Sequence, residues 1–117
     1  MGDHMDPGEQ QEHIQRMVGM LSWKVDATAE QKQKLTAIAA AAVKELEPYH
    51  QKFFDAHKRV HDLLVQPKTD RVALEALRAE QIASADEASK KLVQFLADAA
   101  DVLTPEQRAK LATDWDF

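Results

Sequence analysis

The sequence of 117 residues has no cysteine, three glycines, four prolines and only 6% aromatic residues. The absence of cysteine excludes disulfide bonds, thiol nucleophiles and thiolate metal sites. The longest apolar run, residues 37–43, is far shorter than the ~20 residues that a membrane-spanning helix needs. The shortage of glycine and the abundance of alanine favour helix. We therefore expect an all-α protein that does not insert into a membrane.

The chain also lacks an excess of positive charge. It holds 15 Lys and Arg against 20 Asp and Glu, a net charge of −5. Non-specific nucleic-acid binding depends on clustered basic residues that neutralise phosphates, and no arginine-rich run with aromatic residues occurs here. We therefore expect no nucleic-acid partner.

Arrangements of residues that would indicate catalysis are missing as well. None of the three serines stands in a nucleophile-elbow sequence, and no glycine-rich loop could hold a phosphate. Acidic pairs such as Glu45 with Glu47 have a spacing that turns the two side chains away from each other on a helix. The sequence therefore predicts a protein that is not an enzyme and has no cofactor, apart from a possible divalent metal ion.

The chain is expected to form one domain after a short tail. Residues 1–10 are predicted to be a disordered tail, and its first five, Met1-Gly2-Asp3-His4-Met5, resemble a cloning remnant. No signal peptide is visible, and these residues alone do not indicate export. Residues 11–117 are predicted to form a single helical domain.

Hydrophobic periodicity predicts four helices. The first covers 11–21, and a connector at 22–27 is expected to bury Trp23 and Val25. Two long helices on either side of a turn at 66–69 are expected to pair as an antiparallel hairpin, with Thr69 or Asp70 capping the second. Pro48 predicts a kink in the first long helix, since proline removes one backbone bond and clashes with the preceding turn; a break into two helices is the alternative.

The periodicity also predicts which faces of the long helices are buried. A last helix is expected between Thr104 and Thr113, followed by an aromatic tail with Trp115 and Phe117. The predicted apolar stripe of the first long helix contains Leu35, Ala39, Ala42, Leu46, Phe53, Val60 and Leu64, and that of the second contains Leu74, Leu77, Ala85, Ala88, Leu92, Phe95, Leu96, Ala99 and Leu103.

Two short segments have the sequence of helix starts. Thr28 and Gln31, and again Thr104 and Gln107, have the spacing of a capping box, in which the hydroxyl and the amide each bond to the other residue's backbone. Pro105 suits a first helical position, where no N–H is needed. Leu103 precedes the second segment, whereas an alanine precedes the first.

These two segments resemble the Leu-Thr-x-x-Gln motif that occurs twice in the Spy/CpxP-like group of periplasmic proteins. The resemblance extends over residues 17–115. It implies a curved, cradle-like homodimer in the periplasm that binds partly unfolded polypeptides without ATP. Members of this group also include metal sensors and regulators, so a sensor of zinc, nickel or copper and a regulator of a membrane sensor kinase are the alternatives.

Histidines of the first long helix could bind a metal ion. His57 and His61 are one turn apart, the spacing at which two imidazoles can share an ion. His50 lies two turns from His57, which is too far to join the same ion. His13 and Met17 form a second pair with this spacing, and a His/Met pair would suit a soft or borderline ion. Partly exposed histidines without a metal are the simpler interpretation.

The middle of the same helix has the residues of a polypeptide-binding surface. Phe53 and Phe54 are adjacent, so they point about 100° apart and cannot both enter the core. Exposed apolar patches often bind partners, while packing between two subunits is the alternative. The candidate client-binding residues are Tyr49, Phe53 and Phe54, with Lys52, Lys58 and Arg59 as flanking cations.

Overall fold

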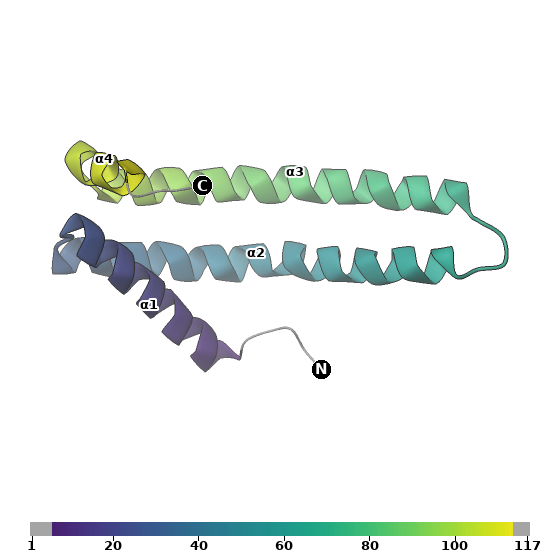
Figure 1. Ribbon diagram of the computed structural model, residues 1–117, viewed down its shortest axis with the longest axis horizontal. Coiled ribbons are helices and arrows are strands. Elements are labelled where there is room, and N and C mark those ends of the chain that lie inside the picture. Colours follow the sequence, from purple (N-terminus) through teal and green to yellow (C-terminus); the bar gives the residue numbers. More distant parts are fainter. Residues whose placement is uncertain (1–5, 114–117) are drawn as a thin grey trace. The chain divides into compact units, whose positions relative to one another are not determined.

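The computed structural model describes residues 6–113, and all regular structure in this part of the chain is helical (Figure 1). The predicted all-α class is therefore confirmed. One short helix precedes the two long helices and another follows them. The four helices are α1 (Pro7–Val25), α2 (Ala29–Leu64), α3 (Arg71–Val102) and α4 (Pro105–Thr113).

The chain divides into two compact units. The first unit, Met1–Ala42 with Gln94–Phe117, contains α1, the beginning of α2, the end of α3 and α4. The second unit, Val43–Val93, contains the rest of the two long helices and the turn between them. The core lies in the first unit, where buried apolar side chains from both of its chain segments meet: Ile14, Val18, Val25, Leu35 and Leu103.

Helix α1 begins at Pro7, so the prediction of a disordered tail as far as residue 10 is wrong for the described residues 6–10. The Asp6 carboxylate accepts a hydrogen bond from the Glu9 backbone N–H at 2.8 Å and caps the helix. Pro7 takes the first helical position, where its missing N–H costs nothing. Aspartate followed by proline is therefore the signal that starts this helix.

The end of α1 also differs from the prediction. Helix continues to Val25, through most of the expected connector, and stops at Asp26, which adopts a left-handed conformation with φ 53°. The Asp26 N–H bonds back to the Ser22 and Trp23 carbonyls, and so satisfies free groups of the last turn. Val25 is buried as predicted, but Trp23 is 80% exposed, since continued helix turns it away from the core.

Helix α2 runs through Pro48 without a break in its helical assignment. The alternative of two separate helices is therefore wrong, and the kink at Pro48 stays a prediction. The 36-residue length of α2 means that one helix contributes to both units.

Within the second unit, α2 and α3 are antiparallel. The connecting turn ends at Asp70, whose carboxylate accepts from the Ala73 N–H at 3.0 Å, so Asp70 rather than Thr69 caps α3. Three contacts give the register: Tyr49 to Glu87, the Lys52 carbonyl to Gln81, and Arg59 to Glu80. The α3 residue numbers fall as those of α2 rise, which confirms the predicted helical hairpin.

The predicted stripes are only partly buried. Leu35, Leu77 and Leu103 are buried, but Phe53 is 61% exposed and Leu64, Leu92 and Leu96 are also exposed. In the second unit, the buried residues are Ala56 and Leu77 instead. Exposure here follows from geometry: a side chain is buried only where a second helix covers it, whichever stripe it belongs to.

Two further findings concern the limits of the chain. No helix among residues 6–113 is long and apolar enough to span a membrane. The predicted aromatic tail, Trp115 and Phe117, lies outside the described residues.

Candidate functional site

Both predicted capping boxes form. Gln31 donates its backbone N–H to the Thr28 hydroxyl at 3.1 Å, and the Thr28 N–H donates to the Gln31 side-chain oxygen at 2.9 Å. Gln107 and Thr104 make the same two bonds at 3.2 and 2.9 Å. Each pair satisfies two of the free N–H groups at a helix start, of α2 and of α4 respectively.

The two glutamines also bond to each other, which the sequence analysis did not foresee. The Gln31 Nε2 donates to the Gln107 Oε1 at 2.8 Å, and the Gln107 Nε2 donates to the Gln31 Oε1 at 3.0 Å. Their remaining N–H groups donate to the Val102 and Val25 carbonyls. Each side-chain amide therefore uses both donors and both acceptor lone pairs, the full capacity of the group.

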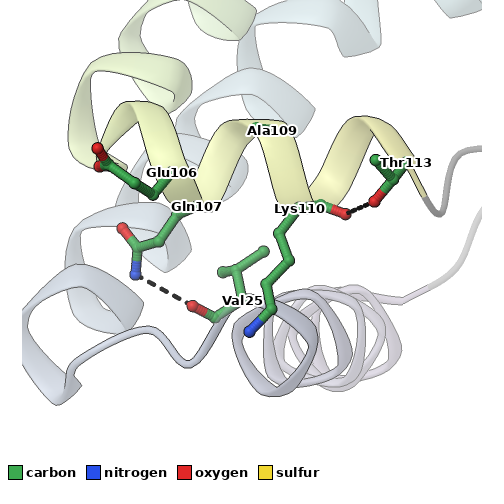
Figure 2. Close-up of a pocket in the computed structure, with 6 residues that line it drawn as sticks. All are labelled: Val25, Glu106, Gln107, Ala109, Lys110 and Thr113. Atoms are coloured by element: carbon green, nitrogen blue, oxygen red, sulfur yellow. Dashed lines mark hydrogen bonds between the residues drawn. The ribbon is translucent and has the colours of Figure 1, made fainter.

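This glutamine pair joins the ends of all four helices. It connects the carbonyls at the ends of α1 and α3 to the first turns of α2 and α4, and it lies beside buried Leu103 and Val25. Figure 2 shows Gln107 reaching Val25 at the rim of a shallow hollow between α1 and α4. At the same rim, Lys110 pairs with Asp26 at 3.2 Å. These contacts hold helices in place and supply no reactive group.

A row of aromatic rings lies on α2 in the second unit. The His50 ring meets the Phe54 ring edge-on at 4.8 Å between centroids, the Phe54 and Phe53 rings are 6.1 Å apart, and Phe53 stacks on His57 at 6.5 Å. Phe53 is 61% and Phe54 37% exposed. The two phenylalanine rings are thus exposed to solvent within a row of four contacting rings.

Exposed apolar residues of α3 lie on the same side of the hairpin as this row. Ala56 on α2 and Leu77 on α3 face the neighbouring helix. At 100° per residue, Phe53 and His57 lie about 60–100° around the α2 axis from Ala56. Because α2 and α3 are antiparallel, side chains of α3 that are rotated from Leu77 in the same direction lie on the same side of the hairpin as these rings. Ile82, Leu92 and Val93 are rotated from Leu77 in this direction. We call this side the aromatic face; its residues are His50, Phe53, Phe54, His57, Leu64, Ile82, Leu92 and Val93.

The other predicted client-binding residues do not join this face. The Tyr49 hydroxyl donates to Glu87 at 3.3 Å, and the Lys52 ammonium lies 5.4 Å from the Tyr49 ring centroid. Arg59 pairs with Glu80 at 3.2 Å. Lys58 is exposed. The predicted set is therefore divided, with the phenylalanines on one side of the hairpin and Tyr49, Lys52 and Arg59 engaged with α3.

A groove lies on the side of the hairpin away from the aromatic face. Its lining includes the buried Ala56 and Leu77, with basic side chains from α2 and acidic side chains from α3. The Arg59–Glu80 ion pair crosses between the two helices there. Neither phenylalanine is among the lining residues, which supports the division into two sides: Lys52, Ala56, Arg59, Leu77, Glu80, Gln81, Ala83, Ser84 and Glu87.

The candidate metal ligands are in separate parts of the chain. His57 and His61 lie one turn apart on α2, and the His61 ring nitrogen Nδ1 is 3.7 Å from the Asp62 carboxylate. His13 and Met17 lie on α1, in the first unit, and are exposed. No group of three or more His, Cys, Asp or Glu that could hold a metal occurs in residues 6–113. The part of the chain that the structure describes thus offers these candidate ligands only as pairs.

Ion pairs neutralise much of the charge in the second unit. Lys91 pairs with Glu45 between the helices, and Arg78 pairs with Glu75 within α3. The hydrogen bond from Arg78 lowers the pKa of the Glu75 carboxyl, and the same bond raises the pKa of Arg78. Both side chains are exposed, so this pair makes a small contribution to stability.

The fold and the double threonine–glutamine motif together define a four-helix protein built around a helical hairpin. A model of the family described as Heavy-metal resistance matches residues 1–110. The chain belongs to this family, which confirms the resemblance to Spy/CpxP-like proteins. Searches of curated proteins and of solved structures found no match.

Proposed function

We propose that this protein binds partly unfolded polypeptides on its aromatic face, in the periplasm and without ATP. The observation that carries the proposal is the exposure of Phe53 and Phe54, which contact each other on α2. Exposed apolar patches of this kind on a helical surface serve as interaction sites. Membership of a family of Spy/CpxP-like proteins supports a periplasmic role.

Binding on this face depends on apolar contact more than on charge. The second unit contains nine basic and nine acidic residues, so it has no net charge. Arg59 and Lys52, which were expected to attract clients, already contact Glu80 and the Tyr49 ring. Apolar burial contributes about 25 cal/mol per Å², so a client segment that covers Phe53 and Phe54 gains most of its affinity from the rings.

We also propose that two copies of the chain associate. Among residues 6–113, eight residues are buried, whereas fourteen large apolar side chains are exposed. Exposed apolar side chains of this kind gain stability when a second copy of the chain covers them. Sedimentation at micromolar concentration tests the association, and a stable monomer would contradict it.

The capture function is tested by the aggregation of a chemically denatured enzyme in the absence of ATP. Equimolar protein should suppress the aggregation, and the double variant Phe53→Ser/Phe54→Ser should lose most of this effect while keeping its helical circular dichroism. The matched control is Val72→Ser, because Val72 is 82% exposed but lies off the aromatic face. Equal suppression by both variants would contradict a role for the rings.

A second candidate function is binding of a divalent metal ion. Two observations favour it: the family is described by heavy-metal resistance, and His57 and His61 are exposed at the spacing of paired ligands. Calorimetric titration with zinc, nickel or copper should show uptake that His57→Ala/His61→Ala abolishes. The variant His13→Ala separates this site from the α1 pair, and uptake that only His13→Ala removes would assign the metal to α1.

A further inference from the structure

Helix α1 has large apolar side chains on two faces. One face, which includes Val18, is buried in the core of the first unit. On the other face, Met17, Met20 and Trp23 are 51%, 58% and 80% exposed. At 100° per residue, these three side chains lie about 100–160° around the helix axis from Val18. A helix that is apolar on both sides is typical of one that is covered on both sides, and the described part of the chain covers only the first face.

The charged residues of α1 are sorted along the helix. Its two acidic residues, Glu9 and Glu12, come first, and its two basic residues, Arg16 and Lys24, follow them. All four are exposed, and none forms an ion pair with another described residue. From Glu9 to Lys24 the helix rises about 22 Å, and the three exposed apolar residues lie between them. We call these charged and exposed apolar residues together the outer face of α1.

We propose that a second copy of the chain docks on the outer face of α1, with the two α1 helices antiparallel; this inference rests on the proposed association of two copies. An antiparallel arrangement brings the acidic end of each helix beside the basic end of the other, and one surface patch then complements itself. It also brings the partly positive N-terminus of each helix beside the partly negative C-terminus of the other. A parallel arrangement would bring like charges together.

The net charge of the two units favours a second copy at this face. The first unit has eleven acidic and six basic residues, so two first units repel each other on average. Helix α1 has two residues of each sign and adds nothing to this repulsion. Docking on α1 also leaves Phe53 and Phe54, which belong to the second unit, for the proposed capture of polypeptides.

The apolar part of the proposed interface is tested by sedimentation equilibrium of the whole chain at low ionic strength. Met20→Ser/Trp23→Ser should weaken the association of two copies about tenfold or more, because a few large side chains contribute most of the affinity of an interface. The matched control is Val72→Ser, since Val72 is 82% exposed on α3, and it should associate like wild type. Circular dichroism checks that both variants keep their helix content.

Charge substitutions test the antiparallel orientation. Lys24→Glu should weaken association about tenfold at low salt, because a symmetric dimer loses two ion pairs at once. Glu9→Lys/Lys24→Glu should restore association, since opposite charges again meet. Lys68→Glu makes the same change of charge in the turn between α2 and α3 and should have little effect. Stronger association of Lys24→Glu, or equal weakening by Lys24→Glu and Lys68→Glu, would overturn the antiparallel pairing.

The outcomes separate this inference from the association on which it rests. A wild-type chain that stays monomeric would overturn both. If Met20→Ser/Trp23→Ser leaves association unchanged while Phe53→Ser/Phe54→Ser weakens it, the second copy docks on the aromatic face and only this inference is wrong. The aggregation assay gives a further readout: Met20→Ser/Trp23→Ser should still capture a denatured enzyme. Loss of capture without loss of association would assign the outer face of α1 to polypeptides instead.

Discussion

The two units of this chain use the same long helices in different ways. In the first unit, five apolar side chains are buried together and two glutamines satisfy each other's amides. In the second unit, only Ala56 and Leu77 are buried, and large apolar side chains such as Phe53 and Ile82 are exposed. A long regular helix therefore does not by itself indicate a buried core. Most of the buried apolar side chains lie in the first unit, whereas the second unit exposes most of its apolar side chains.

The charges divide in the same way. The first unit contains eleven acidic and six basic residues and so accounts for the whole net charge of −5, whereas the second contains nine of each. The acidic first unit favours solubility through self-repulsion. The neutral second unit has no long-range attraction for charge of either sign, which suits the proposed binding of polypeptides through apolar contacts.

The largest effect on stability is expected from Leu77→Ala. Leu77 is the only fully buried large side chain among the described residues, and truncation of a buried leucine costs about 2–5 kcal/mol. Urea denaturation should show a loss in this range. Leu64→Ala, on the exposed side of α2, is the control and should cost much less; equal losses would mean that the second unit has no core of its own.

The next largest effect is expected from Gln107→Ala. It removes the partner of the Thr104 N–H, the Gln31 amide and the Val25 carbonyl, and partly buried groups without partners cost about 1–3 kcal/mol. Hydrogen exchange should accelerate in α1 and α4 and change little in the second unit. Gln33→Ala, an exposed glutamine two residues from Gln31, should have no comparable effect.

Ser22→Ala should stabilise the first unit. The Ser22 hydroxyl is buried and has no hydrogen-bond partner within residues 6–113, and alanine is the better helix former. We expect a gain of about 1 kcal/mol in thermal or urea unfolding. Ser89→Ala serves as the comparison, because the Ser89 hydroxyl is exposed and bonds to the Asp86 carbonyl. A loss of stability in Ser22→Ala would show that its hydroxyl does have a partner.

The smallest effect is expected from Gly19→Ala. A Cβ at Gly19 would meet nothing within 4 Å, and replacing a helical glycine by alanine gains about 0.5–1 kcal/mol. Gly8→Ala in the same helix should gain less, because its Cβ would lie 3.3 Å from the capping oxygen of Asp6. Thermal unfolding of the two variants checks this order, and destabilisation by Gly19→Ala would contradict the helical packing of α1.

Local signals in the sequence predicted much of the fold. The capping pairs Thr28 with Gln31 and Thr104 with Gln107 marked two helix starts correctly, because such bonds involve residues three apart. Asp6 and Pro7 are likewise a capping residue and a first helical residue for α1, but they lie within the segment predicted to be a tail. Where the start of a helix depends on residues close together in the chain, the sequence is enough to predict it.

Contacts between distant residues could not be predicted in this way. The bonds between Gln31 and Gln107 follow from the packing of separate helix ends, and one chain gives no spacing rule for them. Burial of the stripe residues failed for the same reason: Phe53 and Leu35 share a pattern, but only Leu35 is covered by another helix. The sequence therefore predicts which residues belong to the candidate site, but it does not predict that they lie on two opposite sides of the hairpin.

The glutamine pair has a consequence for how the length of the molecule can change. It closes the chain over 76 positions, and the whole second unit lies inside this loop. The entropy of closing a loop grows only slowly with its length. Matched insertions or deletions of whole helical turns within the second unit would thus lengthen or shorten its two helices while the bonds between Gln31 and Gln107 stay intact, so the length of the hairpin can vary independently of the first unit.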